Sequence, residues 1–317
     1  MNNMKRMIVS VLLVCAFTSC AWANDDAPMR LGVMKFLTRT EGVTEQQAAA
    51  IGDIFARILT NSPSFIIVER DRIDDLAREH QFAQSGIFKD DVVIELGKLM
   101  SCKYMLVGSV TNLEKKVSET DLWLVSKKRE EISATIDVRV VDITTSKVIK
   151  AFSESGSSAR EGEGFNFYGF QTEKGKAFEG IEESAIAEAV FRMSFKIRET
   201  LAGERIQVID VNTKEITIDA GKNWGIGEGN LFGVYSEGKE VVDLNGASMG
   251  RRLTLLAVVR ITDSQGDFSY AQIVKNGGRA SSLRKGNRLA PITQKEANDF
   301  IKKSKKSPAS KNSTKSR

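Results

Sequence analysis

The stretch from Phe65 to Thr111 limits the possible folds of this chain more than any other. It opens with an apolar run, Phe65–Val68, that has the length and β-branched content of a buried strand. Two helical patterns follow, the second beginning near Asp90, and a further apolar run, Tyr104–Val110, closes the unit. A strand, two helices and a strand form a crossover. We therefore expect the two strands to lie parallel, as neighbours in one sheet.

Residues on both sides of this unit extend the sheet-and-helix pattern. Arg30–Phe36 is typical of a first strand, and Thr44 and Gln47 form a capping box for a helix that ends at Asn61. Apolar and polar residues alternate from Ile132 to Val140, as in a half-buried strand. The spacing of apolar residues predicts a long helix over about 179–202, ended by Gly203.

A few residues in this region carry a family resemblance. Val68-Glu69-Arg70 lies at the end of the strand that begins at Phe65, and Leu76 and Glu79 follow on the next helix. Gly108-Ser109 lies in the strand that begins at Tyr104. This pattern resembles the CsgG family over about residues 30–202. The founding members of that family export curli subunits across the outer membrane. The resemblance implies an α/β (α+β), anticodon-binding-like domain of sheet and helices, and a protein that forms a homo-oligomeric ring.

Beyond Gly203 the periodicity is that of short strands separated by glycine turns. This pattern predicts a small all-β, barrel-like domain, with a sandwich as the alternative. The segment Gly221–Phe232, followed by a strand that ends in Val259–Thr262, resembles the C-terminal domain of flagellar assembly protein T. We expect four regions: a signal peptide (1–23), a CsgG-like domain (24–202), the β domain (203–293) and a disordered basic tail (294–317).

The N-terminus has the pattern of a secretory signal. Two cations precede the apolar core Met7–Phe17, and Ala21-Trp22-Ala23 is a cleavage site before Asn24. Cys20, preceded by Phe17-Thr18-Ser19, is similar to a lipobox, so lipidation at Cys20 is the alternative to cleavage after Ala23. Both alternatives predict an exported protein of a Gram-negative envelope, in the periplasm and, with lipidation, associated with the outer membrane.

The formal net charge of +5 does not describe the folded part of the chain. Seven cations and no acid follow Ile301, in a tail too poor in apolar residues to bury itself. Without this tail and the signal peptide the chain is net acidic, which excludes nucleic acid as an expected partner. Cys102 is the single cysteine beyond the signal region, so no internal disulfide is expected; its place before a buried strand predicts a small buried hydrophobe.

Signals of catalysis or cofactor binding are weak. His80 is the only histidine, and it lies on a charged helix. No serine has the G-x-S-x-G context of a serine triad, and a zinc site needs more ligands than the one His and one Cys that remain beyond the signal region. The segment Gly225–Gly229 imitates a dinucleotide fingerprint, but strand residues follow it, and no helix N-terminus can hold a phosphate. We expect a non-enzymatic protein without cofactor, metal or small-molecule substrate.

Two segments, 113–131 and 153–176, correspond to the places where CsgG channel subunits contribute hairpins to a shared barrel. Charges on both segments weaken the prediction of membrane insertion. Their aromatic residues are our candidate contacts with partners: Trp123, Phe165, Phe167, Tyr168 and Phe170. The sequence thus predicts a periplasmic or outer-membrane-associated ring or scaffold that binds copies of itself and other envelope proteins. An oligomeric CsgG-type secretion channel and a flagellar basal-body accessory protein are the alternatives.

Overall fold

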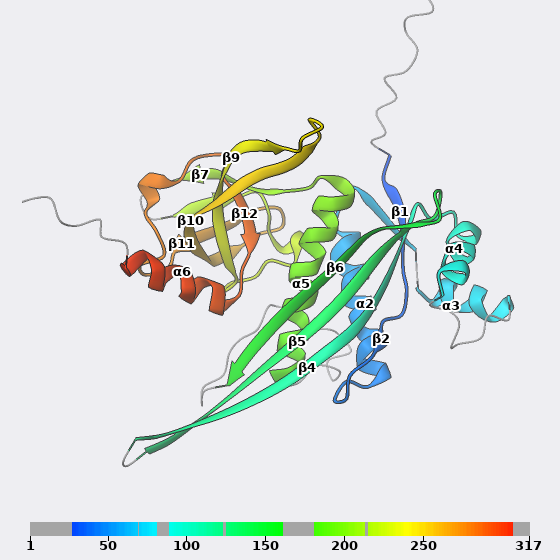
Figure 1. The fold of residues 1–317 in the computed structure, drawn as a ribbon, viewed down its shortest axis with the longest axis horizontal. Coiled ribbons are helices and arrows are strands. Elements are labelled where there is room, and N and C mark those ends of the chain that lie inside the picture. Colours follow the sequence, from blue (N-terminus) through cyan, green and yellow to red (C-terminus); the bar gives the residue numbers. More distant parts are fainter. Residues whose placement is uncertain are drawn as a thin grey trace, which may run out of the picture.

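A computed structural model describes residues 27–68, 70–80, 89–122, 125–160, 181–212 and 215–306. It consists of a six-stranded mixed sheet and a closed six-stranded barrel, with the long helix α5 (Ile181–Ala202) between them (Figure 1). In the described part of the chain, no helix has both the length and the apolar character that a membrane span requires.

The sheet has the strand order β3-β1-β4-β5-β6, and β2 pairs with β4 beside this path. Its strands are β1 (Met29–Val33), β2 (Leu37–Thr38), β3 (Phe65–Val68), β4 (Tyr104–Leu122), β5 (Val125–Asp142) and β6 (Lys147–Arg160). The predicted crossover strands β3 and β4 do lie parallel in one sheet. They are not neighbours, because Leu31 of β1 pairs with Ile67 of β3 on one side and with Tyr104 of β4 on the other. A crossover pattern in the sequence predicts that two strands are parallel, but it does not determine whether another strand lies between them.

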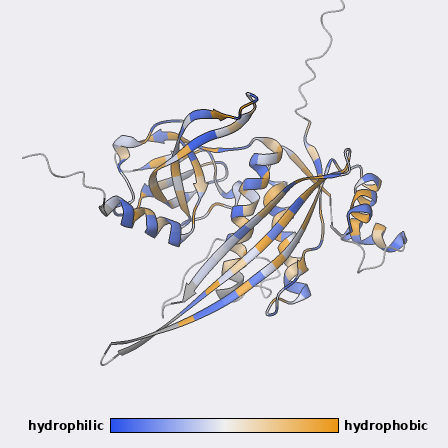
Figure 2. Cartoon of the chain, in the orientation of Figure 1, coloured by the Kyte–Doolittle hydropathy of each residue, from blue (hydrophilic) through white to orange (hydrophobic). Residues whose placement is uncertain are grey.

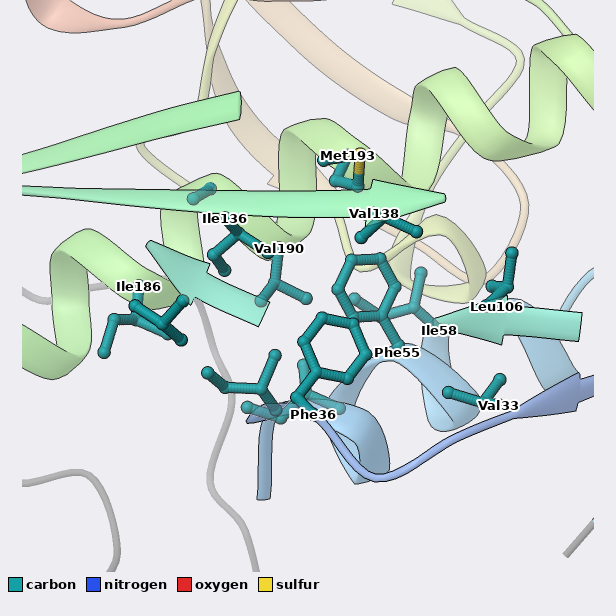
Figure 3. Close-up of a cluster of buried hydrophobic side chains, with 14 of the residues drawn as sticks. Val33, Phe36, Phe55, Ile58, Leu106, Ile136, Val138, Ile186, Val190 and Met193 are labelled. Atoms are coloured by element: carbon teal, nitrogen blue, oxygen red, sulfur yellow. The ribbon is translucent and has the colours of Figure 1, made fainter. Parts of the chain in front are cut away.

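The face of the sheet toward α2 (Glu45–Thr60) and α5 carries the largest core. Helix α2 begins with the predicted capping box of Thr44 and Gln47 and ends at the predicted Asn61. Phe36 stacks on Phe55 of α2 with ring centroids 5.2 Å apart, and the alternating apolar residues of β5 close the core from the sheet side (Figure 3).

The other face of the sheet packs against α3 (Arg70–Glu79) and α4 (Asp90–Leu99). Cys102 is buried in this smaller core, as predicted, and burial raises the pKa of its thiol to about 11 against a weaker opposite effect of Arg30. A thiol with so high a pKa is a poor nucleophile. His80, just beyond α3, is exposed.

The barrel closes in the order β10-β11-β8-β7-β12-β9. Its strands are β7 (Ile206–Val211), β8 (Ile216–Ile218), β9 (Leu231–Val242), β10 (Ser248–Ser264), β11 (Ser269–Ile273) and β12 (Arg288–Pro291). Of the sequence alternatives, the barrel is confirmed and the sandwich is wrong. Sequence analysis missed β12, which closes the barrel between β7 and β9, because its four residues are too few to show a period. Two 3₁₀ turns, η1 (Lys222–Trp224) and η2 (Ala280–Ser282), complete the barrel domain.

The predicted disordered tail is wrong for its first half, which forms helix α6 (Gln294–Lys306). Thr293 and Glu296 cap each other in a box at its start: the Glu296 carboxylate accepts the Thr293 N–H at 2.6 Å, and the Thr293 hydroxyl accepts the Glu296 N–H at 3.1 Å. Ala297 is 1 % exposed and packs with Phe300 against the barrel. Few apolar residues are enough here because a preformed barrel supplies the other half of the interface. Residues 307–317 lie outside the described residues.

Candidate assembly surface

The β4–β5 hairpin leaves the body of the protein at Leu113. Up to this residue, β4 packs into the core, and from Glu114 to Val117 successive side chains are exposed on both faces of the strand. The two strands stay in register to the pair Leu122 and Val125. Figure 1 shows the hairpin projecting well beyond the rest of the sheet. The sequence prediction of a hairpin over 113–131 is therefore confirmed.

This projecting part also has backbone edges without a strand partner. Described strands pair with the outer edge of β4 only as far as Val110, where β2 ends. On the other side, β6 pairs with β5 out to Glu130 and Arg160, and the tip of the hairpin extends past that pair. A strand edge with unpaired N–H and C=O groups is a template for adding a strand from another chain.

Charged side chains on the hairpin limit unspecific pairing along this edge. Lys115 forms an ion pair with Glu130 across the two strands, and Lys116 lies 4.0 Å from Glu114 along the strand. Charges of both signs on an edge are a common protection against aggregation, and they favour partners with a complementary pattern.

The strand next to the hairpin, β6, is clamped onto α5. A Cβ added to Gly156 would lie 2.0 Å from the Ala185 carbonyl oxygen and 2.6 Å from the Ala189 nitrogen, so the backbones of strand and helix are in contact. One turn along, the Glu188 carboxylate accepts the Ser157 N–H at 2.6 Å. Burial raises the pKa of Glu188 to about 7, against the lowering effects of this hydrogen bond and of Arg192.

A cluster of ion pairs joins β6, α5 and α6 next to this clamp. Arg192 of α5 donates to Glu154 of β6 at 3.0 Å and to Glu296 of α6 at 2.7 Å. Lys196 forms a second ion pair with Glu154, which is only 5 % exposed. Burial alone would raise the pKa of Glu296, but hydrogen bonds from Arg192 and Thr293 outweigh it and hold that pKa below its usual value. The hairpin sheet and the barrel are thus held in a fixed relation to each other.

A pocket of about 110 Å³ lies beside this cluster, between α5 and the barrel. Its cations are already paired with carboxylates: Arg192 and Lys196 with Glu154, and Arg288 and Arg205 with Glu199. No group of three metal-ligating side chains occurs among the residues that the structure describes. Each of these four cations is therefore already engaged within the fold.

The sequence-predicted contact residues lie where the structure gives no description. Trp123 falls in the gap between β4 and β5, and Phe165, Phe167, Tyr168 and Phe170 fall in 161–180. Cys20 lies before the first described residue. These remain predictions. The second candidate segment, 153–176, is described only up to Arg160, where it continues β6.

Sequence reasoning overlooked the residues that hold the hairpin sheet in place. These residues lie on two elements, Gly156 on β6 and Glu188 and Arg192 on α5. The periodicity of a single segment cannot show that two such elements are in contact. One signal was present: Gly156 breaks a run of serines at the end of a strand, and an isolated strand glycine often marks a close approach of another backbone.

Comparisons with known proteins bear on this arrangement. The family model described as curli production assembly/transport component CsgG matches residues 29–227, well over half of the chain. The chain belongs to the CsgG family. The match contains the whole sheet, the hairpin and α5, and it continues into the first strands of the barrel. CsgG-family membership places the protein among components of the cell envelope. The comparisons do not support the resemblance of its C-terminal region to flagellar assembly protein T.

Several solved structures share parts of the fold. A hypothetical protein from Chlamydia trachomatis is 16 % identical over 56 % of this chain and 100 % of its own, with a TM-score of 0.38. The LpoB C-terminal domain from Salmonella enterica is 14 % identical over 42 % and 85 %, with a TM-score of 0.31. The PelC dodecamer from Paraburkholderia phytofirmans is 14 % identical over 52 % and 86 %, with a TM-score of 0.28. Likenesses this weak bear on neither function nor oligomeric state. No curated protein matches the chain.

Proposed function

We propose that this CsgG-family protein is a non-enzymatic assembly or transport component of the cell envelope, which forms a homo-oligomeric ring or scaffold in the periplasm or at the outer membrane. The observation that carries the proposal is the projecting β4–β5 hairpin: the β4 side chains from Glu114 to Val117 are exposed on both faces of the strand, and no described strand pairs with the outer edge of β4 beyond Val110.

A two-stranded hairpin of this kind gains little stability by itself in water. The exposure of the β4 side chains from Glu114 to Val117 on both faces is therefore best explained by a surface that covers the hairpin in the assembled state. A second copy of the same chain is the partner we propose, because it brings an identical hairpin with charges of both signs, Glu114 and Lys116, on its exposed strand. Head-to-tail contacts of one hairpin with the next would close into a ring.

The test is to shorten the hairpin without changing its register. Lys115 and Ile132 are register partners, so residues 116–131 can be replaced by a two-residue Asn-Gly turn. We expect the protein to change from an oligomer to a monomer in light scattering, with its thermal unfolding almost unchanged. The matched control shortens the β9–β10 hairpin between the partners Glu240 and Arg251 and should leave the oligomer intact. A monomeric natural protein, or equal loss in both variants, would contradict the proposal.

The same hairpin favours a second candidate, an oligomeric CsgG-type secretion channel. An alkaline wash of outer membranes from cells that carry Cys20→Ser distinguishes the two, because this variant cannot be held by a lipid on residue 20. Retention in the membrane pellet, together with oligomers that resist detergent, would favour the channel. Release into the soluble fraction would leave the periplasmic scaffold.

A further inference from the structure

The C-terminal end of the molecule concentrates positive charge. Between Phe268 and Lys306 the sequence has ten lysines and arginines but only two acids, Glu296 and Asp299. Glu296 is already engaged with Arg192 and with the cap of α6. Two cations of the segment, Lys285 and Arg288, pair with acids from outside it, Asp210 and Glu199. Asp299 is the remaining acid of the segment itself.

The fold brings together two segments that carry four of these cations. The Ser304 hydroxyl donates to the Asn276 carbonyl oxygen at 3.2 Å, and Phe300 packs in one cluster with Val274. The second half of α6 therefore lies against the turn between β11 and η2. The exposed cations of these two segments form what we call the α6 cationic face: Lys275, Arg279, Lys302 and Lys303.

These four side chains differ in their ion pairing from the cations at the junction of sheet and barrel. Arg192, Arg198, Arg205 and Arg288 all form ion pairs within the fold. No ion pair involves a member of the α6 cationic face in the part of the chain that the structure describes. In the sequence, seven cations and no acid follow Ile301, and Lys302 and Lys303 are the first two of them.

We propose that the α6 cationic face binds the surface of an anionic lipid membrane through phosphate-bearing headgroups. Clusters of several lysines and arginines next to a membrane bind acidic lipid through additive electrostatic attraction. An acidic protein fits less well. Protein interfaces depend on buried aromatic or aliphatic anchors, and none of the large exposed hydrophobic residues of the described chain lies between Val274 and Ser304. Figure 2 shows α6 largely in hydrophilic colours, in contrast to the strands of the sheet.

The test measures sedimentation of the purified protein with two kinds of vesicle, phosphatidylcholine alone and phosphatidylcholine with about a third phosphatidylglycerol, a composition that carries the negative surface potential. We expect binding to the anionic vesicles to exceed binding to the neutral ones and to fall as salt rises. A lipid anchor on Cys20 would add equally to both kinds and leave their ratio unchanged. The triple variant Lys275→Gln, Lys302→Gln, Lys303→Gln should lose roughly a hundredfold of the anionic preference.

The matched control removes three exposed cations from the other end of the molecule: Lys98→Gln, Lys147→Gln, Lys150→Gln. It changes the net charge equally and should retain most of the anionic preference. Equal loss in the two triple variants would show attraction by net charge alone and overturn the proposal. Loss on deletion of residues 307–317 with no effect of the first triple variant would also overturn it, as would capture by peptidoglycan or an acidic protein without binding to anionic vesicles.

Discussion

At the scale of single residues, Gly156 sets how closely α5 approaches the sheet. The nearest atoms to a Cβ at this position belong to the backbone of α5, at 2.0 Å and 2.6 Å. Backbone of a packed helix cannot move aside as the end of a flexible side chain can. The helix can therefore pack on β6 at this depth only while residue 156 has no side chain.

Gly156→Ala is accordingly expected to destabilise the protein by about 1–3 kcal/mol, because the added methyl group overpacks the interface. Urea unfolding at neutral pH measures the loss. The control is Gly266→Ala, where the nearest atom to an added Cβ is the Asn223 side-chain nitrogen at 3.8 Å, an ordinary contact. A change at position 156 no larger than the change at position 266 would contradict the close approach.

Glu188 predicts a dependence of stability on pH. Its pKa rises from an ordinary 4.5 to about 7 in the folded protein, mainly because of burial. Below pH 4.5 the carboxyl group is protonated in both states. Between pH 4.5 and 7 the unfolded chain releases the proton while the folded protein retains it, so stability falls by roughly 3 kcal/mol across this range and then stays level.

Glu188→Gln should remove this part of the pH dependence, since the amide oxygen can still accept the Ser157 N–H. We expect the variant to be more stable than the natural protein at pH 8 and about equal at pH 4.5, in urea unfolding at both values. Glu95→Gln, an exposed carboxyl group on α4, is the control and should follow the natural protein. Parallel pH profiles of the natural protein and Glu188→Gln would refute the assignment.

At the scale of elements, α5 is buried on two sides. Val190, Met193 and Ile197 face the sheet, while Phe191 and Phe195 belong to the core of the barrel. Phe191 lies 4.7 Å from Phe195 and 6.3 Å from Phe232 of β9, in edge-to-face contacts between ring centroids. One helix thus supplies part of two cores, and loss of its barrel side should destabilise strands that are distant in sequence.

Phe191→Ala is expected to cost about 3–5 kcal/mol, the usual loss for a large buried aromatic residue. The fluorescence of Trp224, which packs on Phe195, reports on the barrel when it is measured in a Trp22→Phe, Trp123→Phe background. Thr200→Ala changes an exposed position of the same helix and should be nearly neutral. A barrel transition that does not shift in Phe191→Ala would mean that the barrel is stable without α5.

A comparison of individual helices and strands also shows which local sequence patterns are sufficient to predict an element. Helix α2 could be predicted from its capping box and apolar face, because both signals lie within sixteen residues. The extension of β4 to Leu122 and of β6 to Arg160 could not, since those residues are stabilised by pairing with β5. Helix α6 was missed for a similar reason: Ala297 and Phe300 become an apolar face only against the barrel.

At the scale of the whole molecule, the ion pairs of Arg192 connect the sheet to the barrel domain. Arg192 reaches Glu154 on β6 and Glu296 on α6, and its side chain is 15 % exposed. If Arg192 is removed, its carboxylate partners stay shielded from water but lose the ion pair that compensates for their desolvation. The two halves of the molecule should then unfold less cooperatively.

Arg192→Met is therefore expected to cost about 3 kcal/mol and to separate the unfolding of barrel and sheet into two calorimetric transitions. Arg205→Met is the matched control, because the ion pairs of Arg205 with Glu199 and Glu237 lie near the surface and contribute about 1 kcal/mol or less. One sharp transition in both variants would show that apolar packing alone couples the halves.

The candidate assembly surface could be predicted only in part from the sequence. The charged hairpin of residues 113–131 was recognised as such, because the charges that flank its apolar centre are a local pattern. The length of its free edge could not be predicted, since an edge is free or paired according to which other strands end beside it. Here the length of the free edge is set by the positions at which β2 and β6 end.

The sequence by itself determined the sequence-local properties of this protein: the family resemblance, the main strands and helices before Gly203, the capped helix α2, and the change to short strands after Gly203. Each depends on the period, the caps or the turn residues of one segment. Only the tertiary structure decided that β1 separates β3 and β4, that β12 closes the barrel, that α5 serves two cores and that α6 lies on the barrel. Each of these joins segments far apart in the chain, and such contacts form only where a complete set of partners buries enough apolar surface to offset the loss of chain entropy.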